Sequence, residues 1–355
     1  MNGNFATAKP SLPSHSFINK KVLCLQENNF TPYTPFRILL KYVLIFGTKY
    51  IAVALIMQKK LIVLAGPTAV GKTELAIDIA LRYRTEILSA DSRQFYRELN
   101  VGTAKPDTDM LSKVKHHFIN NLSVHDEYNA GTYERDALIC LQEIYENNDI
   151  AVLCGGSGLF IDAVCRGFDA LPEKDENIRN TLNQRLKEQG LESVAEELKR
   201  IDPVYAGQAD IKNPVRVIRA LEVYYITGMP YSALRVRRVE PRFFSSIKIC
   251  LYRERNELYQ RIDSRMDTML KNGLVEEAKS LLPYAHLNAL QTVGYSEVFD
   301  YLNGKYDYNE LVRLLKRNSR RYAKRQLTWF RKDPEYAWFH AEEREQIFKY
   351  LDEKI

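Results

Sequence analysis

The feature that most constrains this chain is a glycine-rich loop between an apolar segment and a helical pattern. Residues 60–65 are mostly apolar, and residues 66–73 have the spacing Gly-x-x-x-x-Gly-Lys-Thr. Glycines at these positions let successive backbone N–H groups surround a phosphate, and the N-terminus of the next helix adds the positive end of its dipole. The sequence therefore predicts a loop that binds a di- or triphosphate. Its residues are Gly66, Pro67, Thr68, Ala69, Val70, Gly71, Lys72 and Thr73.

Two residues of this loop have specific predicted tasks. A lysine in the position of Lys72 reaches the terminal phosphate oxygens, and a hydroxyl in the position of Thr73 suits Mg²⁺. We therefore expect Mg²⁺ as the cofactor and Thr73 as its ligand from the protein.

Strands and helices alternate after the loop. Residues 85–90 indicate a second short strand, about 132–147 a helix, and 150–154 a buried strand that ends in a second glycine-rich turn. This alternation predicts a three-layer α/β core with a parallel sheet, similar to that of P-loop NTPases. In such sheets ligands bind beyond the carboxyl ends of the strands, so Asp91, directly after the second strand, is positioned for chemistry.

Changes in composition and in the helix and strand pattern divide the chain into four predicted parts. Residues 58–166 form the first part of the core, and 167–228 form a charge-rich helical insertion that is broken at two X-Pro steps. Residues 229–355 complete the core and add a basic helical region. Residues 1–57 are unlike the rest, and we expect an extension outside the folded enzyme, disordered or non-native, with Met57 as the start of the working protein.

Two other interpretations of residues 1–57 stay open, an organellar presequence and a membrane anchor. The apolar segment 37–57 would have to supply the anchor, but Lys41 and Lys49 interrupt every 18-residue window of it. Each lysine costs about 3 kcal/mol near the centre of a bilayer. We therefore expect no membrane association.

The net charge of +6 gives a misleading impression of a basic enzyme. Residues 1–57 contain six Lys or Arg and one acidic residue, so the remaining chain is nearly neutral. Any surface for nucleic acid must be a local patch. The five cysteines show neither a Cys-x-x-Cys pair nor a metal-binding spacing, which is typical of reduced thiols in a cytoplasmic protein.

A local patch of this kind is present between residues 311 and 332, which contain nine basic residues and no acid. Several recur at steps of three and four and so share one helical face. Without acidic partners on the same helix these charges favour an anion, and Trp329 and Phe330 offer flat faces to a base. A nucleic-acid track is the favoured interpretation, and a solvated basic face is the alternative. The basic residues are Arg313, Lys316, Arg317, Arg320, Arg321, Lys324, Arg325, Arg331 and Lys332.

Together these segments resemble the tRNA dimethylallyltransferase (tRNA isopentenyltransferase) family. The similar stretches follow the family's order from about residue 60 to the C-terminus. Lacking the zinc finger of the nuclear-encoded members, the chain is similar to the shorter bacterial form. The stretches are Gly-Pro-Thr-Ala-Val-Gly-Lys-Thr (66–73), Ala-Asp-Ser-Arg-Gln (90–94), Gly-Thr-Ala-Lys-Pro (102–106), Gly-Gly-Ser-Gly-Leu (155–159), Asn-Pro-Val-Arg-Val-Ile-Arg-Ala-Leu-Glu (213–222), Thr-Val-Gly-Tyr (292–295) and Ala-Lys-Arg-Gln-Leu-Thr-Trp (323–329).

The resemblance implies transfer of a dimethylallyl group from dimethylallyl diphosphate to the exocyclic amine of an adenosine beside the anticodon of tRNA. It implies Asp91 as the base, Lys72 and Arg219 as cations for the leaving diphosphate, and Thr68 as a hydrogen-bond donor to it. The anticodon stem-loop is the expected partner, with the target base flipped out of its stack, and the expected enzyme is a monomer. The implied tRNA path comprises Asp91, Ser92, Arg93, Gln94, Ser157, Arg179, Val215, Arg216, Val217, Ile218, Arg219, Leu290, Gln291, Thr292, Val293, Gly294, Tyr295, Lys324, Arg325, Gln326, Leu327, Thr328, Trp329, Phe330 and Arg331.

Several alternatives remain open at this point. Asp91 is either the base or an organiser of the metal, and Arg216 and Arg219 are either ligand-binding or salt-bridged to Glu222. An enzyme that prenylates free adenine nucleotides is a rival, although a mononucleotide needs no long cationic track. A kinase that uses the loop for ATP is a second rival. A GTPase-like RNA-binding switch is a third, disfavoured because the chain has no Asn-Lys-x-Asp motif.

Overall fold

The computed structural model describes residues 59–169, 171–235 and 240–355. The expectations for residues 1–57, including the anchor and the presequence, lie outside these ranges. Within them, no helix combines the length and the apolarity that crossing a membrane requires.

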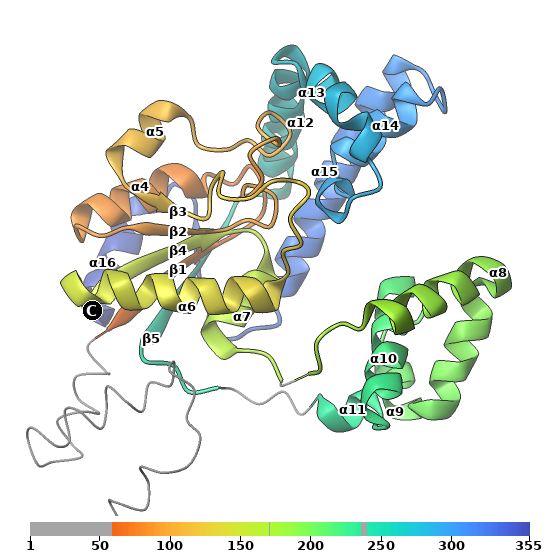
Figure 1. Cartoon of the computed structure of the whole chain (residues 1–355). Coiled ribbons are helices and arrows are strands. Elements are labelled where there is room, and N and C mark those ends of the chain that lie inside the picture. The colour runs from red at the N-terminus through yellow and green to blue at the C-terminus, as the bar shows by residue number, and fades with distance from the viewer. Residues whose placement is uncertain (1–58, 170, 236–239) are drawn as a thin grey trace, which may run out of the picture. The chain divides into compact units, whose positions relative to one another are not determined.

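Six parallel strands form one sheet in the order β3-β2-β4-β1-β5-β6 (Figure 1). Its central strand β1 is almost entirely apolar and buried, as is typical of parallel strands that are covered on both faces. The edge strand β6 was not predicted, because four residues after a basic helix carry too little periodicity to identify a strand. The strands are β1 (Lys60–Ala65), β2 (Ile87–Ala90), β3 (His116–His117), β4 (Ile150–Gly155), β5 (Ser245–Tyr252) and β6 (Ala337–His340).

Helices cover both faces of the sheet and confirm the predicted three layers. In Figure 1, α4 lies on one face of the sheet, and α6 and α7 lie on the other. The C-terminal helix α16 adds its buried side chains to the α4 face. These helices are α4 (Lys72–Arg82), α5 (Thr108–Lys113), α6 (Ala130–Asn147), α7 (Gly158–Arg166) and α16 (Arg344–Lys354).

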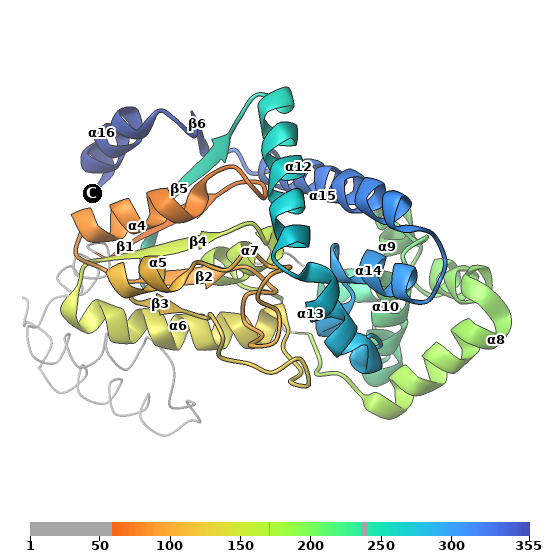
Figure 2. The ribbon, with the colours of Figure 1, turned by 90° about the horizontal axis from the view of Figure 1, so that it is seen from above.

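A group of helices lies at the edge where the strands end (Figure 2). The long helices α12 and α15 pack against each other, and α13 and α14 pack in sequence against them. Most of their buried residues join the core cluster that also contains α6 and α7, and a few from α12 and α15 join the cluster on the α4 face. The group consists of α12 (Arg255–Lys271), α13 (Leu274–Leu281), the 3₁₀ turns Leu282–Tyr284 and Asn288–Leu290, α14 (Tyr295–Leu302) and α15 (Tyr308–Phe330).

The helical insertion has a core of its own, built from leucine, valine and tyrosine side chains. The two predicted breaks are present, because α9 and α10 begin at Pro203 and Pro214 after the capping residues Asp202 and Asn213. Tyr231, at the start of residues 231–234, still packs against this core, so the insertion extends beyond the predicted boundary at 228. Its helices are α8 (Glu176–Ile201), α9 (Pro203–Gln208), α10 (Pro214–Thr227) and α11 (Tyr231–Leu234).

A buried carboxylate links two helices of the insertion. Glu222 on α10 is 0% exposed and accepts hydrogen bonds from Arg179 on α8 and from Arg219. Burial raises the pKa of Glu222, but the bonds from the two guanidinium groups outweigh it, and the net pKa is lowered. The charged form of Glu222 is therefore the form that stabilises the insertion.

We expect Glu222→Gln to lower the free energy of unfolding by about 2–3 kcal/mol at neutral pH, because two partly buried guanidinium groups lose their counter-charge. Since the folded pKa lies below the unfolded one, the contribution of Glu222 is present above the unfolded pKa and is lost as pH falls through the folded pKa. Urea unfolding followed by circular dichroism, with exposed Glu192→Gln as control, measures both effects. Equal midpoints for Glu222→Gln and wild type would contradict this role.

Candidate active site

The phosphate loop between β1 and α4 has the predicted backbone. Gly66 has φ of 153°, and a Cβ atom there would lie 2.9 Å from the carbonyl oxygen of Leu251, so only glycine fits. Gly71 adopts a left-handed conformation with φ of 109° and begins the helix. The local sequence alone thus accounts for the shape of this loop.

Lys72 and Thr73 lie at the first turn of α4, as expected. The Lys72 Nζ atom donates to the carbonyl oxygens of Gly66 (3.0 Å) and Pro67 (2.8 Å), which holds its charge over the loop. Burial lowers the pKa of Lys72, while the nearby carboxylate of Asp91 acts in the opposite direction. The Thr73 hydroxyl forms no hydrogen bond with any described residue, so its oxygen is available to a hard cation such as Mg²⁺.

The turn that carries Asp91 is joined to the second glycine-rich turn. The Asp91 Oδ1 atom accepts from the backbone N–H of Arg93 at 3.0 Å. The Ser157 hydroxyl accepts from the N–H of Ser92 at 3.1 Å, and the N–H of Ser157 donates to Ala90 at 3.2 Å. The carboxylate is therefore held in place by backbone contacts at the end of β2.

A cavity of about 90 Å³ lies in front of this turn, several times the space that one water molecule needs. Its lining combines apolar side chains, mainly from α12 and α13, with the polar or charged groups of Thr68, Asp91 and Arg265. An amphipathic ligand with a short hydrocarbon tail and a charged head matches this combination. The lining residues are Thr68, Ala69, Asp91, Arg93, Gly102, Thr103, Ile262, Arg265, Met266, Met269, Leu274, Thr292, Val293, Gly294, Tyr295, Ser319 and Tyr322.

One wall of the cavity is tied to α13 by a single carboxylate. Glu277 accepts from the backbone N–H groups of Asn100, Val101 and Gly102 at 2.8–3.0 Å. It also accepts from the hydroxyl of Tyr295 at 2.6 Å. The loop 99–105 and the start of α14 are thereby brought together at the cavity.

Arg265 is the cation that sequence reasoning missed. Its guanidinium group lines the cavity and forms no ion pair with a described residue. Burial lowers the pKa of Arg265, and the neighbouring Asp91 opposes this. A faint signal was present in the sequence: Ile262, Met266 and Met269 form an apolar helical stripe, and Arg265 lies on its edge.

Arg219, the predicted second cation, is not brought to this cavity. It lies on α10 of the insertion, where its guanidinium group donates to Glu222 at 2.7 Å and to the carbonyl oxygen of Pro172 at 2.7 Å. Arg179 is engaged by the same carboxylate. For Arg219 the salt-bridged alternative is therefore present in the structure, whereas Arg216 forms no ion pair with Glu222. The role of Arg219 toward the diphosphate stays a prediction.

The basic face of α15 is partly neutralised, contrary to the expectation of free charges. Arg313 pairs with Glu310, and Lys316 and Arg320 pair with Asp267 and Asp263 of α12. The C-terminal half is different, because none of its cations forms an ion pair with an acid in the described part of the chain. These unpaired cations are Arg321, Lys324, Arg325, Arg331 and Lys332.

The residues of the implied tRNA path have very different exposures. Val215, Arg216, Gln291, Lys324 and Trp329 are exposed. Others are buried and offer no surface to RNA, because a continuous range on a helix turns only part of its side chains outward. These buried residues are Val217, Ile218, Leu290, Gly294, Tyr295, Gln326 and Phe330.

Known proteins resemble the chain over most of its length. The model of the IPP transferase family matches residues 94–333. A tRNA dimethylallyltransferase of Cytophaga hutchinsonii is 48% identical over 299 residues, which cover 84% of this chain and 98% of the relative. One of Christiangramia forsetii is 47% identical over 300 residues, with coverage of 84% and 99%.

Two solved structures share the fold. The tRNA isopentenylpyrophosphate transferase of Bacillus halodurans is 35% identical and has a TM-score of 0.62, with coverage of 83% of this chain and 96% of that one. A eukaryotic dimethylallyltransferase acting on tRNA is 25% identical and has a TM-score of 0.66, with coverage of 81% and 75%.

We expect Arg265→Gln to weaken the binding of inorganic diphosphate about 10–100-fold, because one charge-assisted contact in a partly buried site is lost. Calorimetric titration of diphosphate in the presence of Mg²⁺ measures the change. Arg255→Gln, which removes the same charge from an exposed position of α12, is the matched control. Equal weakening in both variants would mean that Arg265 acts only through net charge.

Proposed function

The chain belongs to the IPP transferase family, and on this premise we propose that it is a tRNA dimethylallyltransferase. It transfers the dimethylallyl group of dimethylallyl diphosphate to the N6 amine of the adenosine on the 3′ side of the anticodon and releases diphosphate. The observation that carries this proposal is the cavity, which combines apolar side chains, residues of the phosphate loop and a carboxylate at the same edge of the sheet. We propose that the enzyme acts as a monomer in the cytoplasm.

Asp91 is the proposed base for the nucleophile. The N6 lone pair of adenine is delocalised into the ring, so this amine is a weak nucleophile until its proton is removed. As the new bond forms between N6 and C1 of the dimethylallyl group, the bond between C1 and the bridging oxygen breaks. The electron pair leaves with diphosphate, and the proton passes from N6 to the Asp91 carboxylate.

The leaving diphosphate is stabilised by cations and hydrogen-bond donors that are already in position. Lys72 and Arg265 provide positive charge, and the loop amides and the Thr68 hydroxyl provide donors. Thr73 is the proposed protein ligand of Mg²⁺, which, when bound, neutralises charge on the diphosphate oxygens. The apolar side chains of Ile262, Met266 and Met269 face the hydrocarbon tail and exclude water from the reacting carbon.

The unpaired cations of α15 are the proposed track for the tRNA backbone. These cations lie on α15 and directly after it, close in sequence to Ser319 and Tyr322, which line the cavity, so RNA on this helix would lie next to the reacting groups. The adenine must leave the stack of the anticodon loop to reach Asp91, and exposed Trp329 offers a flat face to a base.

The experiment that tests the function offers the enzyme three pairs of substrates. With dimethylallyl diphosphate and unmodified tRNA we expect prenylated adenosine and released diphosphate. Replacing tRNA by AMP tests the nucleotide-prenylating rival, and replacing dimethylallyl diphosphate by ATP tests the kinase rival. Product from either substitute at a rate comparable to that of the proposed pair, or none from the proposed pair, would reject the proposal.

The role of Asp91 is tested by Asp91→Asn, which preserves size but cannot accept the proton. We expect single-turnover transfer to fall roughly 10²–10⁴-fold, the usual contribution of a general base, with both substrates still bound. The loss should persist when Mg²⁺ is raised. Recovery to nearly the wild-type rate at high Mg²⁺ would instead assign Asp91 to the organisation of the metal.

The role of the unpaired cations is tested by comparing Arg321→Glu with Arg313→Glu. Both change the charge of α15 equally, but Arg313 is already paired with Glu310. We expect Arg321→Glu to weaken tRNA binding and to reduce the slope of log affinity against log salt by about one, because a phosphate contact is lost. Arg313→Glu should have the smaller effect on the slope, and both variants should bind dimethylallyl diphosphate normally. Identical salt slopes for the two variants would contradict a specific track.

A further inference from the structure

One buried side chain connects the two glycine-rich turns of the site. Gln326 of α15 is only 7% exposed, and both ends of its amide are engaged. Its Oε1 atom accepts from the backbone N–H of Thr68 in the phosphate loop at 2.9 Å. Its Nε2 atom donates to the carbonyl oxygen of Gly156 in the second turn, also at 2.9 Å. A Cβ atom on Gly156 would lie 2.3 Å from Nε2, so this approach requires glycine.

The Gln326 amide belongs to a chain of contacts that leads to Asp91, the proposed base. Gly156 precedes Ser157, whose hydroxyl accepts from the N–H of Ser92, the residue after Asp91. The connection therefore runs from Thr68 through Gln326 and the second turn to Asp91. Thr68 and Asp91 both line the cavity. Through hydrogen bonds, Gln326 therefore links Thr68, which is proposed to face the diphosphate, with Asp91, which is proposed to face the amine.

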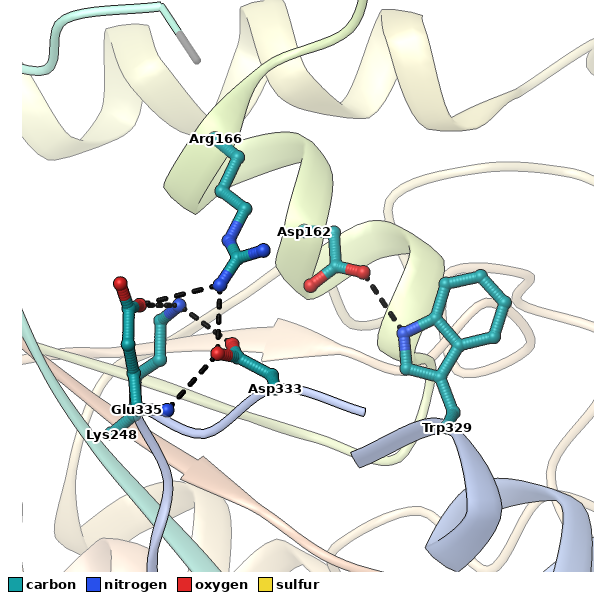
Figure 3. Close-up of polar contacts among 6 residues, drawn as sticks. All are labelled: Asp162, Arg166, Lys248, Trp329, Asp333 and Glu335. Carbon is teal, nitrogen blue, oxygen red and sulfur yellow. Dashed lines mark hydrogen bonds and ion pairs between the residues drawn. The ribbon is translucent and has the colours of Figure 1, made fainter. Parts of the chain in front are cut away.

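The end of α15 that carries Gln326 is anchored from two sides (Figure 3). On α7, the Asp162 carboxylate accepts from the indole Nε1 of Trp329 at 2.9 Å. On β5, buried Lys248 contacts Asp333 at 2.9 Å and Glu335 at 2.5 Å. These contacts keep the helix end against the sheet, so the amide of Gln326 is held at a fixed place.

We propose that Gln326 is a positioning residue for the transfer step, which sets the separation between the phosphate loop and Asp91. The inference rests on the proposed function. Gln326 touches neither substrate; it acts through the backbones of Thr68 and Gly156. A displacement of about 1 Å between reacting groups can cost about 100-fold in rate, so a side chain that fixes this separation affects chemistry more than binding.

The first test is Gln326→Leu, which keeps a similar side-chain volume but leaves the N–H of Thr68 and the carbonyl of Gly156 without partners. We expect the single-turnover rate at saturating substrates to fall about 10–100-fold. The dissociation constants of the anticodon stem-loop and of inorganic diphosphate should each change less than about threefold. A rate within threefold of wild type would overturn the proposal.

A control variant tests whether a less stable α15 by itself lowers the single-turnover rate. Leu315→Ala, in the buried face of α15 and away from the cavity lining, lowers stability without touching the amide. We expect this variant to melt at a lower temperature but to retain the wild-type single-turnover rate below its melting range. A loss of rate equal to that of Gln326→Leu would assign the effect to helix stability and overturn the proposal.

Gln326→Glu provides a pH-dependent readout. Its carboxylate would face the carbonyl oxygen of Gly156, and this repulsion and burial raise the pKa of the introduced group. Below that pKa the neutral acid donates to Gly156 as the amide does. We therefore expect the ratio of variant to wild-type rate to rise as pH falls, and a ratio independent of pH would contradict the proposal. Failure of the proposed function appears differently, as the absence of transfer by the wild type itself.

Discussion

The site depends on the shared register of three parallel strands. Ala65 of β1 and Ala90 of β2 are both paired with Gly155 of β4, so the three loops that follow begin at the same level of the sheet. A Cβ atom on Gly155 would lie 2.2 Å from the carbonyl oxygen of Ala90, which makes glycine a requirement of this close packing. The Asp91 turn and the second glycine-rich turn therefore exchange hydrogen bonds directly, and the Gln326 amide joins the phosphate loop to the second turn. A slip of one residue would separate them.

Only the cations that form no ion pair are proposed to bind the substrates. Three of the nine basic residues between 311 and 332 are neutralised by Glu310 and by two aspartates of α12, and Arg179 and Arg219 of the insertion are held by buried Glu222. Arg265 and the C-terminal cations of α15 lack such partners among the described residues. The first faces the cavity and the others face solvent. In the proposed function, this division separates a place for the diphosphate from a surface for RNA, although both are built from arginine and lysine.

Much of the fold and part of the site could be predicted from local patterns. The phosphate loop, the strand that ends before Asp91, the helix breaks at Pro203 and Pro214 and the parallel three-layer core all follow from short-range rules, because glycine, proline and apolar periodicity act on neighbouring residues. Several of the residues predicted to contact tRNA have buried side chains. Contiguous ranges were assigned as contacts, whereas helices bury Val217, Ile218 and Phe330.

By itself, the sequence determined that the chain has a phosphate loop before a helix, an acidic residue at a strand end and a basic helix, because these features need only adjacent residues. Only the tertiary structure decided which charges remain free. Arg265 became a cavity residue because α12 packs beside α15 and the loop, and Gln326 became an internal bridge because its helix lies across two turns more than 160 residues away in sequence. Pairing and burial depend on neighbours distant along the chain, and no local pattern encodes them.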